Sequence, residues 1–92
     1  MSVRSWHAAA VNIWETEGRR FEVVMASDVV RDGMALELTD LDGDAGAGPA
    51  LEIFWSHSDR TFEFLAHQPV RLPLAVLTRF VDAAVSRLPP GT

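Results

Sequence analysis

The chain has no cysteine and no lysine, and these two absences remove several classes of chemistry. Without cysteine there is no disulfide framework, no thiolate nucleophile and no cysteine-ligated zinc. All eight basic residues are arginine, so a Schiff-base lysine and the phosphate-binding lysine of nucleotide loops are also excluded. Disulfide-rich secreted scaffolds and two large groups of enzymes are therefore not expected.

Long apolar runs are missing as well. No segment approaches the roughly 20 apolar residues that span a bilayer, and the first residues lack the charged-then-apolar order of a secretion signal. We therefore expect a cytoplasmic protein that does not enter the membrane. The 92 residues suit a single domain, residues 1–92, because a chain of this length is too short for two separate cores.

The acidic residues are concentrated in the middle of the chain. Residues 28–63 hold nine acids and two arginines, a local net charge of −7, whereas the whole chain carries −5. Such a region repels phosphate backbones and speeds the approach of basic partners. This balance disfavours nucleic acid and favours a cationic protein partner, although acidic surfaces also serve solubility alone.

Four segments alternate apolar and polar residues with the period of two that is typical of strands with one buried face. They are residues 20–26, 34–39, 51–56 and 61–67. The last two are expected to pair through a four-residue turn over 57–60, because an even loop keeps their apolar positions on one face. In this register Trp55 lies opposite Phe62, and Ile53 lies opposite Phe64.

The end of the chain changes to the three-and-four apolar spacing of an amphipathic helix. Pro73 suits a first helical turn and Pro89-Pro90-Gly91 ends the pattern, which predicts a helix over about 73–88. Residues 5–16 fit a helix or a strand, and the turn-like residues that follow favour a strand. The sequence thus predicts an α+β fold, an antiparallel meander of four or five strands with one C-terminal helix packed on one face.

Aromatic residues are frequent for so small a domain, with three tryptophans and five phenylalanines. Most are expected in the core, because aromatic side chains carry the largest apolar area per residue. The predicted core consists of Phe21, Val23, Leu36, Leu38, Ile53, Trp55, Phe62, Phe64, Leu77, Phe80, Val81 and Ala84.

A second apolar stripe falls on the opposite face of the predicted sheet. Phe54, Leu65 and Val24 lie there among the acidic residues Glu52 and Glu63. One helix about 10 Å wide cannot cover both faces of a sheet whose strands lie roughly 4.8 Å apart. We expect these five residues to meet a partner protein or a second copy of the chain. The alternative is an ordinary solvated face with isolated apolar residues.

Three aspartates in the middle of the chain could form a metal site. Asp40, Asp42 and Asp44 have the alternate spacing of a calcium-binding loop, but Ala45 stands where glycine is needed and Leu51 where a glutamate is needed. These aspartates are therefore a weak candidate, and no metal is expected.

The string Ser56-His57-Ser58-Asp59 contains the residue types of a hydrolase triad. Adjacent residues on one turn cannot point at one another in the order that such a relay requires, so no catalytic residue is assigned. A small enzyme or ligand-binding domain with a pocket near Trp6, Trp14 and the His57 turn is the alternative function. No cofactor is expected.

The end of the chain contains the segments Pro69-Val70-Arg71-Leu72-Pro73-Leu74, Val76-Leu77, Phe80-Val81 and Arg87-Leu88-Pro89. In these segments it resembles the tail of some small bacterial polymorphic-toxin immunity proteins. The resemblance covers the last quarter of the chain and implies a non-catalytic inhibitor that binds its toxin, often through an acidic surface. It assigns no functional residue. Together with the charge, it leads us to expect a non-enzymatic protein-interaction module, either an inhibitor of a basic partner or a homodimer.

Overall fold

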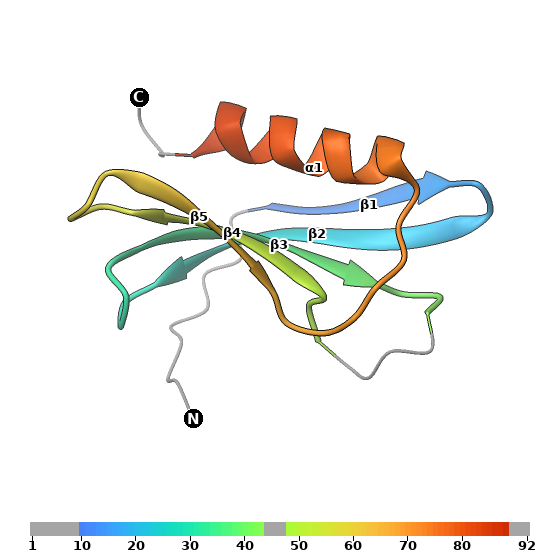
Figure 1. The fold of residues 1–92 in the computed structure, drawn as a ribbon, viewed down its shortest axis with the longest axis horizontal. Helices are drawn as coiled ribbons and strands as arrows, with labels where there is room; N and C mark the ends of the chain where they lie inside the picture. Colours follow the sequence, from blue (N-terminus) through green and yellow to red (C-terminus); the bar gives the residue numbers. More distant parts are fainter. Residues whose placement is uncertain (1–9, 44–47, 89–92) are drawn as a thin grey trace.

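The alternating segments form one antiparallel sheet, which a computed structural model describes within residues 10–43 and 48–88. The five strands pair in chain order, so β1 and β5 are its two edges in the described part of the chain (Figure 1). The predicted α+β meander with one C-terminal helix is confirmed, and the strands number five. The elements are β1 Ala10–Thr16, β2 Arg19–Asp28, β3 Gly33–Asp40, β4 Leu51–Ser56, β5 Thr61–Ala66 and α1 Leu74–Arg87.

A two-residue turn joins β1 to β2. Its residues, Glu17 and Gly18, have positive φ angles of 53° and 74°, which match the strand twist in a type I′ hairpin. The strand predicted within residues 5–16 is confirmed for β1. Residues 5–9 of that prediction lie outside the described residues.

The connection between β4 and β5 is the predicted four-residue turn over 57–60. Within it, the backbone N–H of Asp59 donates to Ser56 Oγ at 3.1 Å. Trp55 lies opposite Phe62, as expected from the parity of the two strands. The register therefore places the odd-numbered apolar residues of β4 and the even-numbered ones of β5 on the same face as α1.

The helix α1 starts directly after Pro73 and ends before Leu88, within a residue of the predicted span. The backbone N–H of Leu88 donates to the carbonyl oxygen of Ala84 at 2.8 Å and closes the last turn. Val76, Phe80 and Ala84 are buried on the side that faces the sheet. Within the described residues, no helix is long and apolar enough to cross a membrane.

The core lies between α1 and one face of the sheet. Most of the predicted core is confirmed, including Phe21 and Phe80, which are fully buried. The prediction was wrong for three residues, because Phe62, Phe64 and Val81 are 41%, 57% and 41% exposed. The buried members of the core are Trp14, Phe21, Val23, Leu36, Leu38, Ala50, Leu51, Ile53, Trp55, Val76, Phe80, Ala84 and Leu88.

The sideways position of α1 explains this correction. The Arg79 guanidinium lies 4.2 Å from the centre of the Trp14 ring on β1. Arg87 Nη1 lies 3.2 Å from the side-chain amide of Asn12 on the same strand, and the amide oxygen is assigned to this position because it can accept there. In Figure 1, α1 lies alongside β1. Five strands span roughly 19 Å and a helix covers about 10 Å, so the β5 side of this face stays uncovered.

Candidate functional site

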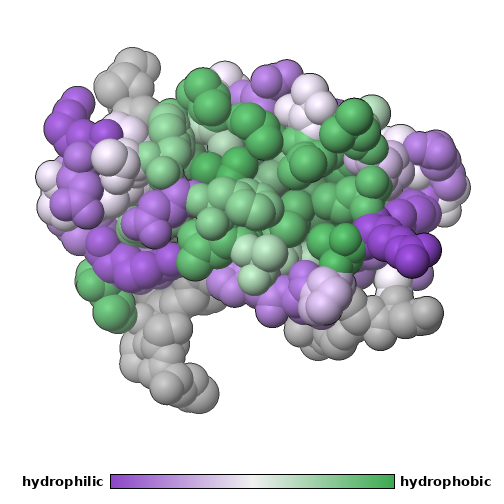
Figure 2. Space-filling view, viewed as in Figure 1, coloured by the Kyte–Doolittle hydropathy of each residue, from purple (hydrophilic) through white to green (hydrophobic). Residues whose placement is uncertain are grey.

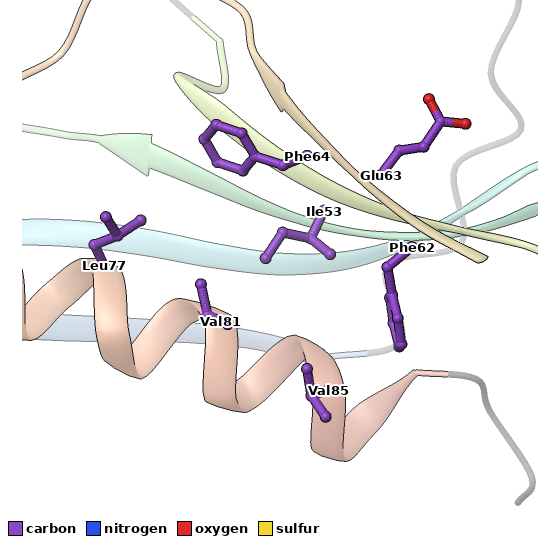
Figure 3. Close-up of a pocket in the computed structure, with 7 residues that line it drawn as sticks. All are labelled: Ile53, Phe62, Glu63, Phe64, Leu77, Val81 and Val85. Carbon is purple, nitrogen blue, oxygen red and sulfur yellow. The ribbon is translucent and has the colours of Figure 1, made fainter.

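An apolar groove lies between α1 and β5, where the helix fails to cover the sheet. It has a volume of about 420 Å³. Figure 2 shows hydrophobic residues gathered across the middle of this side of the molecule, with hydrophilic residues at both ends. The groove is lined from the sheet by Ile53, Phe62 and Phe64 and from the helix by Leu77, Val81 and Val85 (Figure 3).

The spacing of these residues follows from the two elements that carry them. Leu77, Val81 and Val85 recur every four residues and therefore form one stripe along α1. Phe62 and Phe64 alternate along β5 and point to the same side of the sheet. Glu63 stands between them and points away from the groove in Figure 3. The groove therefore presents apolar side chains and contains no inward-pointing ionisable group among its lining residues.

The groove remains open to solvent rather than filled by its own walls. Phe64 is 57% exposed and Val85 is 60% exposed, whereas Ile53 at the floor is 6% exposed. The ring of Phe62 packs against the ring of Trp55, with their centroids 4.9 Å apart. The floor is thus part of the core, while the walls expose large apolar side chains.

The outer edge of β5 also carries backbone groups that no strand in the described part of the chain pairs with. His67 N–H donates to the carbonyl oxygen of Ala50 at 2.8 Å, which sets the alternation of hydrogen bonds between β4 and β5. In an antiparallel pair, successive residues point their N–H and C=O groups alternately toward and away from the partner strand. Counting from His67, the backbone groups of Phe62, Phe64 and Ala66 point away from β4, to the open edge of the described sheet.

This edge has few of the features that prevent strands from pairing. Natural edge strands are protected by lysine, proline, inward-pointing charges or bulges. β5, with the sequence TFEFLA, contains one charge, Glu63, and no proline. Its residues are almost all exposed on both faces. An exposed apolar edge strand beside an apolar groove is a typical surface for association with another chain.

The stripe that the sequence placed on the opposite face is mostly buried, which corrects the expectation that it is open. Phe54 is 3%, Val24 6% and Glu52 1% exposed. Leu65 is half-buried, and Glu63 is exposed. Among these five residues, Leu65 and Glu63 on β5 remain the accessible ones, and they belong to the same edge strand as the groove.

Arg31 is one reason why this face is closed. Its guanidinium lies 4.2 Å from the centre of the Phe54 ring. Arg31 Nε is 2.5 Å from Asp28 Oδ2, and Arg31 Nη2 donates to Glu52. The other carboxylate oxygen of Glu52 lies 2.7 Å from His67 Nε2. The buried carboxylates are thus engaged by cationic or hydrogen-bonding groups of the chain itself.

The charge of Arg31 is stable in this setting. Burial by itself disfavours the cation, but the hydrogen bonds to Glu52 and Asp28 outweigh this effect and raise the pKa of Arg31 above its ordinary value. The group therefore remains a cation at neutral pH. We interpret it as a structural clamp for β4 and the β2–β3 turn rather than as an acid or base.

Two of the three aspartates considered as calcium ligands, Asp40 and Asp42, form salt bridges with arginines. Asp40 Oδ2 lies 2.6 Å from Arg19 Nη2, and Asp42 Oδ1 lies 3.1 Å from Arg20 Nη2. The hydrogen bonds from Arg20 lower the pKa of the Asp42 carboxyl. Asp44 lies outside the described residues. Within the described part of the chain, no group of three or more metal-ligating side chains comes together.

Trp14 and His57, the two described residues of the alternative pocket, do not line a common site. Trp14 is 6% exposed beneath Arg79, and Trp6 lies outside the described residues. His57 lines a separate depression of about 230 Å³ that is formed mainly by the turn between β2 and β3, and Trp14 does not line it. The described geometry therefore gives no common site for Trp14 and the His57 turn.

Comparison with protein-family models, curated proteins and solved structures finds no match for this chain. The sequence pattern predicted Phe62, Phe64 and Val81 in the core and placed Val85 on the apolar side of the helix without including it in the core. A useful signal was present, because β5 is the last strand of a meander and one helix is narrower than five strands.

Proposed function

We propose that this chain is a non-enzymatic protein-binding module whose binding surface is the groove between α1 and β5 together with the open edge of β5. The observation that carries the proposal is the exposure of Phe62, Phe64, Val81 and Val85 around one apolar groove. Large exposed apolar clusters with polar borders are typical of protein interfaces.

The composition of the groove favours binding over catalysis. Glu63 is the one ionisable residue among those that line it, and its carboxylate points away. A catalytic pocket needs convergent polar groups beside its apolar walls. An inhibitor of a basic toxin, which the resemblance of the C-terminal segment implies, is one form that such a binding module takes.

Capture from a lysate of the native host tests the proposal. Val81→Asp places a charge on the wall of the groove, at a residue that is 41% exposed. Val29→Asp is the matched control, because Val29 is 69% exposed in the turn between β2 and β3. We expect wild type and Val29→Asp to retain the same proteins, identified by mass spectrometry, and Val81→Asp to lose at least nine-tenths of them.

Two results count against the proposal. Equal capture by the Val81→Asp and Val29→Asp variants would place the binding surface elsewhere on the molecule. Capture of nothing by the wild-type chain, including its own untagged copies, would leave the exposed groove without a binding role. Circular dichroism of both variants checks that they are folded.

A further inference from the structure

We infer that the partner is a second copy of this chain, bound antiparallel, edge to edge through β5, with Phe64 on the two-fold axis. The inference rests on the proposed function and names the occupant of that surface. It starts from the backbone groups of Phe62, Phe64 and Ala66, which point away from β4. These three residues are spaced evenly around Phe64, so a second copy turned by two-fold symmetry offers matching donors and acceptors.

The side chains favour this register. Phe64 meets Phe64 of the second copy, and each Phe62 lies over the small Ala66 of the other chain. Aromatic pairs and large-against-small pairs are favourable across neighbouring strands. On the other face, Glu63 lies opposite Leu65 of the second copy. All of these residues lie within β5, so no further chain has to become a strand.

The neighbouring registers are worse for identifiable reasons. Centring the pair on Glu63 sets two glutamates directly opposite each other, and like charges in that position are destabilising. Centring the pair on Leu65 would set Phe62 opposite Gln68 of the second copy. Gln68 lies beyond the end of β5, so Phe62 would have no strand residue to pair with. The register centred on Phe64 avoids the charge conflict and uses all three outward-pointing residues.

The apolar area supports a modest but specific contact. Phe62 and Phe64 are 41% and 57% exposed, which leaves roughly 200 Å² of aromatic surface per copy when a whole aromatic residue has about 200 Å². A standard interface buries about 800 Å² per partner. The phenylalanines therefore supply about a quarter of that area, and the paired strand edges with Glu63 and Leu65 add to it.

Symmetry explains why β5 pairs with itself rather than with the other edge, β1. A contact of β5 with β5 is the same patch on both copies, so it closes after two chains. A contact of β5 with β1 would be head-to-tail, so it would not close after two chains and would build a larger ring or a filament. The core face of β1 is moreover covered by α1 through Arg79 and Arg87.

Charge distinguishes a second copy from a basic partner. Each chain carries −5, so two copies repel at long range and salt relieves the repulsion. A basic partner is attracted instead, and salt weakens its binding. We therefore expect the dimer to form more readily as the salt concentration rises.

Sedimentation of the purified chain over a range of protein and salt concentrations tests the inference. We expect a doubled mass at high protein concentration for the wild type, a dissociation constant at least tenfold higher for Phe64→Asp, and no change for Ile13→Asp. Ile13 is the matched control, because it is 54% exposed on the other edge strand, β1. A monomeric wild type at every concentration, or equal dimerisation of both variants, overturns the inference.

Single cysteines provide a second test that survives even if Phe64→Asp fails to fold. The chain has no native cysteine, so each introduced thiol reports on one position. Residues paired directly across the two-fold axis lie about 5.5 Å apart between Cα atoms, within disulfide reach. We expect Phe64→Cys to form a disulfide-linked dimer on mild oxidation and Glu63→Cys and Ile13→Cys not to. The opposite pattern overturns the register.

The two proposals fail differently. If the purified chain is a monomer and its capture from lysate still depends on Val81, the second copy is excluded and the binding module remains. If neither self-association nor lysate capture depends on the groove, the proposed function fails as well.

Discussion

Phe80→Ala is expected to lower the free energy of unfolding by about 3–5 kcal/mol. Phe80 is fully buried at the middle of α1 and packs into the core against the sheet. Removing the ring deletes apolar burial and leaves a cavity that the rigid sheet cannot fill. For a domain of this size the melting temperature should fall by roughly 15–30 °C, which thermal unfolding followed by circular dichroism measures.

Val85→Ala on the same helix is the control for this prediction. Val85 is 60% exposed on the wall of the groove, so its truncation should change stability by less than about 0.5 kcal/mol. A loss as large as that of Phe80→Ala would mean that the wall is buried in solution. The groove would then not be the open surface on which the proposed function depends.

Arg31→Ala is expected to cost about 3 kcal/mol of stability, the second largest effect. The substitution removes the cation from Asp28 and Glu52, whose side chains are 3% and 1% exposed. It also uncovers the Phe54 ring, which the guanidinium overlies. The Arg31 side chain is itself 34% exposed, which places the estimate at the lower end for broken buried pairs. Unfolding in urea measures the loss.

Two further variants separate charge from packing at this clamp. Arg31→Lys keeps the cation but not the fork that contacts both carboxylates, so an intermediate loss is expected. Adding Glu52→Gln to Arg31→Ala should recover part of the loss, because one buried carboxylate is then neutral. If Arg31→Ala were as stable as the wild type, the contacts of Arg31 with Asp28, Glu52 and Phe54 would not contribute to the stability of the fold.

Much of the fold could be predicted from local sequence pattern. The alternation of apolar residues in β4 and β5, combined with the parity of their turn, predicts Trp55 opposite Phe62, and the structure pairs these residues. The change to helical spacing after Pro73 predicted α1 to within a residue. Both inferences depend on neighbours in sequence, for which spacing and turn chemistry are informative.

The binding surface could not be predicted in the same way, because it depends on where α1 lies across the sheet. That position follows from contacts of Arg79 with Trp14 and of Arg87 with Asn12, residues that are far apart in sequence. One helix does leave part of the five-stranded sheet uncovered, as its width predicts. The uncovered part is the β5 side of the helix face. Phe54 on the opposite face is buried, with the Arg31 guanidinium over its ring.

Amide hydrogen exchange along β5, followed by NMR at low and high protein concentration, tests the central claim most directly. The account predicts that the amides of Thr61, Glu63 and Leu65, which point toward β4, are protected at both concentrations. The amides of Phe62, Phe64 and Ala66 should exchange rapidly in dilute solution and become protected as the concentration rises. Even-numbered amides that exchange at the same rate at both concentrations would contradict the account, whether that rate is fast or slow.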